Sequence, residues 1–341
     1  KIGFADDKEA NINDGRQLAA RLAQEIGSQH HSICIGPDHL QKCLKTLVWA
    51  VEEPRLGQCY PNFYANQLAS RSVKVCLSGT GSDEIFGGYP WRYYSHNQFS
   101  NKENYIDHYY HTWHRLLPNK TLHALFGEYV QPHHFQTKAI MRDTILHHLN
   151  TSSGIGQSMH FEAITFLQGL LILEDKIGMH HGLESRIPML DNALVDFAMK
   201  IPNHYKINTQ DLQTVDENNA TQKQFIRSKG KRIFRESLDG ILPQYLLNQP
   251  KQGFTVPDDL WFKSQLKDYV HDTLLSPQAK INDIMNPAVL KNLIHDYTVL
   301  GVSNRRLLVW SLLYMENWLQ LFLTTPQKIH FKQKANLIMP S

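Results

Sequence analysis

Short apolar runs alternate with amphipathic stretches along the first hundred residues of the chain. The apolar runs have the length and composition of β-strands and cover residues 2–4, 32–35 and 73–77. Apolar residues spaced three or four apart predict helices over residues 18–26, 40–51 and 64–69. Strand–helix alternation of this kind predicts a parallel sheet with helices on its faces.

Local start and stop signals support the first two predicted helices. Asp14 precedes the first helix as a candidate N-cap, and Gly27 follows it as a stop. Pro37 and Asp38 can open the second helix, which ends before Pro54. These signals place both helices between predicted strands.

The remainder of the chain, from about residue 105, lacks clear strand signals. Amphipathic or apolar stretches predict helices over residues 108–117, 137–148, 162–176, 192–200, 230–238, 264–274 and 305–323. Residues 208–221 are polar, which predicts a surface loop. The fold class predicted from the pattern is therefore α/β, with a large, mostly helical C-terminal part.

Composition is that of an ordinary globular protein. The chain has 341 residues, of which 42% are hydrophobic and 20% are charged, so disorder is not expected. A formal net charge of +3 is small for this length and disfavours a nucleic-acid partner, including tRNA. The apolar residues 307–323 include Ser311, Glu316, Asn317 and Gln320, which favours a buried helix over a membrane span.

Cysteine and histidine usage gives no sign of a disulfide framework or a zinc site. The four cysteines have no CxxC spacing, which is typical of a reducing compartment and predicts a cytoplasmic protein. Many histidines occur as adjacent pairs, such as His180 and His181. Neighbouring side chains point to different faces of a helix or strand, so these pairs are poor chelates.

The most informative stretch, residues 77–89, follows the third predicted strand. Ser78 and Gly79 stand at the carboxyl end of this strand, where ligands bind in open α/β sheets and glycine lets backbone N–H groups approach closely. Asp83 and Glu84 follow, and a carboxylate beside a phosphate-binding crevice commonly holds Mg²⁺. Gly87 and Gly88 allow a second close turn. A glycine-rich loop with solvated acids is the simpler alternative.

This stretch resembles the LSGxGxDExFGGY signature of the asparagine synthetase family. Further segments resemble family motifs in the same order: residues 2–4, 19–20, 27–31, 53–54, 174–176, 179, 182–191, 201–202, 231–235, 242–243, 251–254, 257, 261 and 310–321. The likeness covers residues 1–325, with residues 1–100 as the α/β nucleotide-binding part, 101–325 as the helical part and 326–341 as a tail. The implied fold is a parallel-sheet core of the adenine nucleotide α-hydrolase, or PP-loop-like, type.

The resemblance also implies a reaction. In the family, ATP adenylates a substrate carboxylate and releases pyrophosphate, and ammonia then displaces AMP to give an amide. The expected cofactors are ATP and Mg²⁺. Ammonia comes from glutamine through a separate glutaminase domain, and the substrate is a small-molecule carboxylate. A homodimer is left open, and neither nucleic acid nor membrane is an expected partner.

Site residues carry over from the family motifs one by one. Asp83 is expected to bind magnesium, and Lys251 to approach the phosphates in the transition state. Without the resemblance, Lys251 is an ordinary loop lysine. A single well-placed donor of this kind contributes about 3–4 kcal/mol to a transition state in which charge builds on phosphoryl oxygens.

The remaining expected site residues concern the nucleotide and the acid. The resemblance implies that Ser78, Gly79 and Gly81 contact the nucleotide and that Ile2 packs near the adenine. Glu184 is assigned a catalytic role, and the alternative is an internal ion pair with a neighbouring arginine at a helix-to-loop corner.

Three departures from the family pattern qualify these expectations. The SGGxDS pyrophosphate loop belongs on a strand before Ile2 and is not in this sequence, and neither is the glutaminase domain. We therefore expect a fragment of a longer enzyme, truncated at its N-terminus and inactive alone. Thr80 stands where aspartate-amidating members commonly carry glutamate. This leaves open a secondary-metabolite, cell-surface or β-lactam-type synthetase, and also a degenerate, non-catalytic binding fold.

Overall fold

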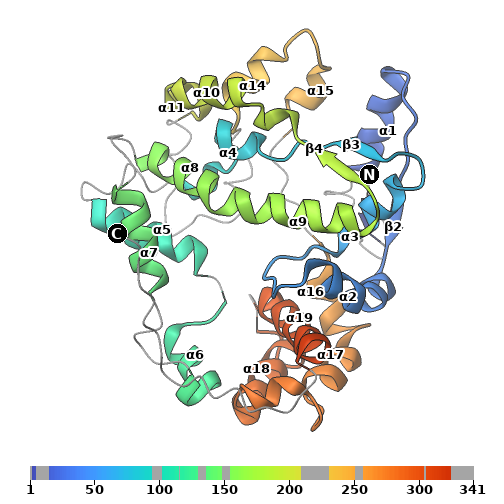
Figure 1. Cartoon of the computed structure of the whole chain (residues 1–341), viewed down its shortest axis with the longest axis vertical. Helices are drawn as coiled ribbons and strands as arrows, with labels where there is room; N and C mark the ends of the chain where they lie inside the picture. The colour runs from blue at the N-terminus through green and yellow to red at the C-terminus, as the bar shows by residue number, and fades with distance from the viewer. Residues whose placement is uncertain are drawn as a thin grey trace. The chain divides into compact units, whose positions relative to one another are not determined.

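The computed structural model describes residues 2–4, 15–93, 102–114, 116–129, 136–147, 154–208, 230–249, 256–302 and 305–323. The chain forms two compact units, each assembled from three separate stretches (Figure 1). The first unit contains Lys1–Gly36, Cys59–Arg115 and Gln136–Pro257. The second contains Pro37–Gln58, Leu116–Phe135 and Asp258–Ser341.

The first unit holds the strands that the structure describes. These are β1 (Ile2–Phe4), β2 (Ile33–Ile35), β3 (Val75–Leu77) and β4 (Glu184–Arg186). Its helices are α1 (Arg16–Glu25), α3 (Tyr60–Ala69), α4 (Ser82–Phe86), α5 (Lys102–Trp113), α7 (Thr137–His147), α8 (Gly154–Ile164), α9 (Phe166–His180), α10 (Asn192–Lys200), α11 (Asn203–Lys206), α14 (Arg232–Ser237) and α15 (Gln244–Leu247). Two short 3-10 turns, η2 (Pro90–Arg92) and η6 (Pro188–Leu190), complete it.

The strands form two parallel pairs. β1 lies beside β2 with Ile2 opposite Ile33, and β3 lies beside β4 with Leu77 opposite Arg186. The predicted parallel pairing is confirmed, but in the described residues the strands form two separate two-stranded sheets and not one sheet. β4 corrects the expectation that the chain after residue 105 is helical. Its Glu-Ser-Arg sequence has no apolar signal, and it becomes a strand because its backbone pairs with β3.

Local capping signals account for several element boundaries. Gly27 adopts a φ of +69° just after α1, as expected for a stop residue. Asp191 is the N-cap of α10, and its carboxylate accepts the backbone N–H of Ala193 at 3.0 Å. Asp14, the predicted cap of α1, lies outside the described residues, as do the tail and nearly all of the predicted loop at 208–221.

Some helices differ from the prediction because turns interrupt the pattern. The single helix expected over residues 162–176 is two, α8 and α9, which break at Thr165 with a φ of −121° and a ψ of −68°. Figure 1 shows α8 and α9 following one another through the first unit. α6 and α18 of the second unit were not predicted, and the helix expected over 264–274 begins only at Lys267.

The second unit is built around a buried helix. Its elements are α2 (Pro37–Val51), α6 (Asn119–Phe126), η4 (Gly127–Tyr129), α16 (Asp258–Lys263), α17 (Lys267–Leu274), η7 (Lys280–Asp283), α18 (Pro287–Thr298) and α19 (Arg306–Phe322). α19 packs on α2, α17 and η7. Its Glu316 is fully buried and accepts the backbone N–H groups of Lys280 and Ile281 at 3.0 and 2.7 Å. No helix in the described ranges is long and apolar enough to cross a bilayer.

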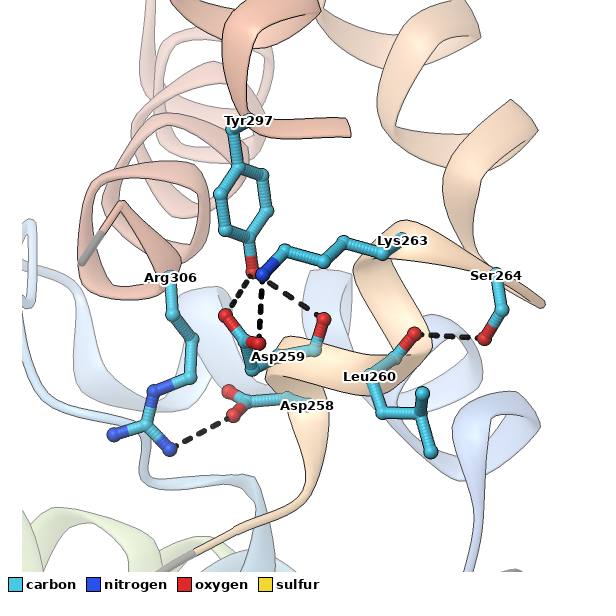
Figure 2. Close-up of polar contacts among 7 residues, drawn as sticks. All are labelled: Asp258, Asp259, Leu260, Lys263, Ser264, Tyr297 and Arg306. Atoms are coloured by element: carbon cyan, nitrogen blue, oxygen red, sulfur yellow. Dashed lines mark hydrogen bonds and ion pairs between the residues drawn. The ribbon is translucent and has the colours of Figure 1, made fainter. Parts of the chain in front are cut away.

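A cluster of charged side chains and one tyrosine hydroxyl joins α16, α18 and α19 (Figure 2). Asp258 is fully buried, and Arg306 Nη1 lies 3.1 Å from its Oδ1. Burial raises the pKa of Asp258 to about 6, and Arg306 opposes this shift. The neighbouring Asp259 accepts the hydroxyl of Tyr297 at 2.8 Å and pairs with Lys263 at 2.8 Å. These contacts fix the start of α16 within the second unit.

Candidate active site

The carboxyl end of β3 continues into a loop stabilised by its own polar groups. The N–H of Ser78 donates to Arg186 O at 2.8 Å and so extends the pairing with β4. Ser82 Oγ donates to Gly79 O at 3.0 Å. Gly81, with a φ of +91°, turns the chain into α4. Ser78, Gly79, Gly81 and the first turn of α4 therefore lie together at one end of the strand.

Asp83, in the first turn of α4, is paired with a lysine from a distant part of the chain. Lys231 Nζ lies 3.0 Å from Asp83 Oδ1 and donates to Ser82 Oγ at 2.8 Å. The two charged side chains are only 21% and 20% exposed. A carboxylate and an ammonium thus meet beside the glycine loop.

Glycines make this close approach possible. A Cβ on Gly88 would lie 1.7 Å from Asp83 Oδ1, and one on Gly230 would lie 2.4 Å from Gly87 O. Gly87 adopts a φ of +69°, and Gly88 N–H donates to Asp83 O at 2.7 Å. The predicted second turn at Gly87 and Gly88 is confirmed, and it lets Gly230 and Lys231 reach α4.

Lys231 was not recognised as a site residue from the sequence, although it belongs to a segment that resembles the family. Its backbone φ of +59° is unusual for a residue with a side chain. The preceding Gly230 is a weak local signal for this conformation. A Gly-Lys pair at the start of a helix occurs in many surroundings and does not by itself indicate a site. The pairing with Asp83 is long-range and has no periodic signature in the sequence.

A second carboxylate approaches the loop through α9. Thr80 Oγ1 donates to Glu174 Oε2 at 2.6 Å, and Ser185 Oγ donates to Glu174 Oε1 at 2.5 Å. Ser78 Oγ lies 3.0 Å from Thr80 Oγ1. α9 packs on β4, which brings Glu174 to the loop. Glu174 therefore supplies a carboxylate beside Thr80, which has none of its own.

Glu184 and Arg186 lie on β4 and pair with each other. Arg186 Nε donates to Glu184 Oε1 at 2.8 Å, and the two side chains are 64% and 51% exposed. The ion pair considered in the sequence analysis is present, although it is exposed and not internal. The catalytic role of Glu184 stays a prediction.

Two further expected residues, Ile2 and Lys251, are not part of this arrangement. Ile2 lines a cavity of about 400 Å³ with His31, which precedes β2, and Val73, which precedes β3. Ser78 follows β3, so the residues that share this cavity with Ile2 lie at the other end of β3 from Ser78. The contact of Ile2 with adenine stays a prediction. Lys251 lies outside the described residues.

Asp83 has the chemistry expected of a magnesium ligand. Mg²⁺ prefers oxygen ligands and is usually held by one or two protein carboxylates together with substrate phosphates. Asp83 is a partly exposed carboxylate beside a glycine loop, which fits this pattern. The described part of the chain contains no group of three or more His, Cys, Asp or Glu side chains that could hold a metal by themselves.

The α/β fold thus places a glycine-rich loop and the Asp83 carboxylate beyond the carboxyl end of a parallel strand. Residues 1–320 match the family model described as asparagine synthase. Because this match covers nearly the whole chain, the chain belongs to the asparagine synthase family.

Similar proteins carry related names. Glutamine-hydrolyzing asparagine synthetase 1 of Bacillus subtilis is 24% identical over 346 residues, covering 93% of this chain and 51% of that protein. A putative glutamine-hydrolyzing asparagine synthetase of Mycobacterium tuberculosis is 25% identical, covering 89% and 48%. Glutamine-hydrolyzing asparagine synthetase 3 of B. subtilis is 26% identical over 253 residues, covering 71% and 36%. The chain spans about half the length of the first two relatives.

Proposed function

We propose that this chain is the synthetase part of an enzyme that amidates a carboxylate at the expense of ATP. The acid is adenylated with release of pyrophosphate, and ammonia then displaces AMP to form the amide. The observation that carries the proposal is the Asp83–Lys231 pair, 3.0 Å apart, beside the glycine loop of a chain in the asparagine synthase family. The relatives are named as glutamine-hydrolyzing, which supports glutamine as the source of ammonia.

Each residue of the site has a proposed task. Asp83 would hold Mg²⁺, which when bound offsets the charge on the phosphoryl oxygens. Ser78, Gly79 and Gly81 would contact the nucleotide through a loop already shaped by its own hydrogen bonds. Lys231, whose ammonium lies beside Asp83, would contact the phosphates of the nucleotide. Lys251 would be a second cation for the phosphates.

The pyrophosphate would be held by a further loop, SGGxDS, which the family resemblance implies on a strand before Ile2 and which is not among the residues of this sequence.

Glu174 bears on the identity of the acid. Its carboxylate, held by Thr80 and Ser185, supplies negative charge beside the loop. This charge would attract the ammonium group of an amino-acid substrate or accept a proton from the attacking ammonia. Aspartate therefore remains the first candidate. Thr80 favours a second candidate, a related acid of different shape. The negative charge beside the loop comes from Glu174 of α9 and not from position 80, so it would lie elsewhere relative to the substrate.

The test is a product analysis with the full-length protein that contains this chain. The protein is incubated with ATP, Mg²⁺, glutamine and a panel of carboxylic acids, and the products are identified by mass spectrometry. We expect AMP and pyrophosphate in equal amounts, formed only with an accepted acid, together with its amide. Formation of ADP and phosphate would contradict adenylation.

A further inference from the structure

A buried ion pair lies close to the candidate site but contains none of its residues. Glu162 of α8 is fully buried, and Arg92 at the end of η2 is 7% exposed. Arg92 Nη1 lies 3.4 Å from Glu162 Oε1. The hydroxyls of Tyr93 and Tyr109 donate to the same carboxylate at 2.7 and 2.6 Å. Burial raises the pKa of Glu162, and Arg92 and the two hydroxyls oppose this shift.

Aromatic rings enclose the other partner of the pair. The guanidinium carbon of Arg92 lies 3.9 Å from the ring centre of Tyr89, 4.5 Å from that of Trp113 and 4.6 Å from that of Phe166. Such contacts stabilise a guanidinium that has lost its water. Trp113 belongs to α5, Phe166 to α9 and the ion-pair partner Glu162 to α8. Contacts with three helices therefore fix the position of Arg92.

Tyr89 connects this network to α4. Its ring faces Arg92, and its hydroxyl donates to Glu84 Oε1 at 2.6 Å. Glu84 is 2% exposed and directly follows Asp83 in α4. Burial, with Glu84 beside it, raises the pKa of the Tyr89 hydroxyl, so this group stays a donor. A continuous series of contacts therefore leads from Glu162 to the helix that carries Asp83.

α4 needs outside support to keep its orientation. It has five residues between two glycines with positive φ, Gly81 and Gly87. A helix of this length is not stable alone in water, so its orientation depends on what its side chains contact. Ile85 and Phe86 anchor its apolar side on α10 and α14. Glu84, through Tyr89, anchors its polar side.

We propose that Tyr89 and Arg92 are positioning residues that hold α4, and with it the Asp83 carboxylate, in the orientation required for the reaction. A buried ion pair contributes little net stability compared with apolar residues of the same shape. The network instead fixes the orientation of the Arg92 side chain, because a planar guanidinium enclosed by three aromatic rings has one favourable placement. The role of Asp83 rests on the proposed function, whereas the support of α4 does not.

Hydrogen–deuterium exchange in the full-length protein tests the support of α4 directly. In Tyr89→Phe and Arg92→Met, the amides of residues 82–88 should exchange about tenfold faster than in the unmodified protein, the change expected when one buried hydrogen bond or ion pair no longer restrains the segment. Tyr105→Phe is the matched control. It removes another buried tyrosine hydroxyl, which contacts Ser158, and should leave residues 82–88 unchanged. Unchanged exchange in both test variants would overturn the proposal.

Kinetics then separate positioning from general stability. In Tyr89→Phe the Mg²⁺ concentration for half-maximal AMP formation should rise and kcat should fall about tenfold, with the KM for glutamine unchanged. Tyr105→Phe should show unmodified values even if its Tm falls. If Tyr89→Phe keeps the magnesium dependence of the unmodified protein, the positioning role is wrong. If the unmodified protein forms no AMP with any acid, the proposed function fails, and the exchange experiment still decides whether Tyr89 and Arg92 support α4.

Discussion

At the scale of single residues, Lys231 combines two features that rarely occur together. Its side chain pairs with Asp83 in a half-buried position, and its backbone φ is +59°. The left-handed conformation costs a residue with a Cβ about 1 kcal/mol, which glycine avoids. The contacts of its ammonium group with Asp83 and Ser82 offset this local cost.

The substitution Lys231→Gly separates these two features. Glycine relieves the backbone strain, so we expect the Tm to stay within a few degrees of its original value. The loss of the ammonium should lower kcat for AMP formation by roughly 10²–10³-fold. Lys231→Arg, which keeps the charge, is the matched variant and should retain more activity. Full activity in Lys231→Gly would remove Lys231 from the site.

Gly88 offers a steric test of the same arrangement. In Gly88→Ala the new methyl group would lie 1.7 Å from Asp83 Oδ1, so the carboxylate must move. We expect AMP formation to fall at least tenfold and the requirement for Mg²⁺ to rise. Gly57→Ala is the control, because a Cβ there has no atom within 4 Å. Equal activity in the two variants would show that the position of Asp83 does not matter.

At the scale of elements, α16 depends on a charge that burial makes unfavourable. The pKa of Asp258 rises from an ordinary value of 3.8 to about 6 in the folded protein. Since the folded state binds this proton more tightly than the unfolded state, this group favours folding below about pH 4, and that contribution is lost as the pH rises through about 6. Arg306 is the cation that limits the loss.

Arg306→Met should therefore destabilise the second unit in a pH-dependent way. At pH 8 the variant leaves a buried carboxylate without its ion-pair partner, at a cost of about 3–5 kcal/mol in the free energy of unfolding. At pH 5 Asp258 can take up a proton, and the cost should shrink. Denaturant unfolding at the two pH values measures the difference. Adding Asp258→Asn should restore much of the loss at pH 8, and an equal loss at both pH values would contradict this role.

The elements that the sequence predicted are those with strong local signals. β3 is apolar, the following loop is rich in glycine, and Asp191 is followed by an apolar helix; all three appear in the structure. β4 could not be predicted, because Glu184–Arg186 has no strand pattern. The contact between Lys231 and Asp83 of α4 could not be predicted either, because only the fold brings these two segments together. The same holds for Glu174, whose contact with Thr80 depends on how α9 packs on β4.

At the scale of the whole molecule, each unit is assembled from three stretches of chain. The second unit receives α2 and α6 from within the sequence of the first, an arrangement that periodicity along the chain does not reveal. The candidate site lies within the first unit, and the charge cluster of Figure 2 within the second. Variants of the two can therefore be interpreted separately.

The proposed reaction transfers an adenylyl group from ATP to a carboxylate at this site. The most direct measurement uses the full-length protein, ATP, Mg²⁺, glutamine and an accepted acid labelled with ¹⁸O in its carboxylate. Attack of that carboxylate on the α-phosphorus, followed by amide formation, leaves one labelled oxygen on AMP. We predict ¹⁸O in AMP and none in free phosphate or pyrophosphate. Labelled inorganic phosphate together with ADP would contradict the account.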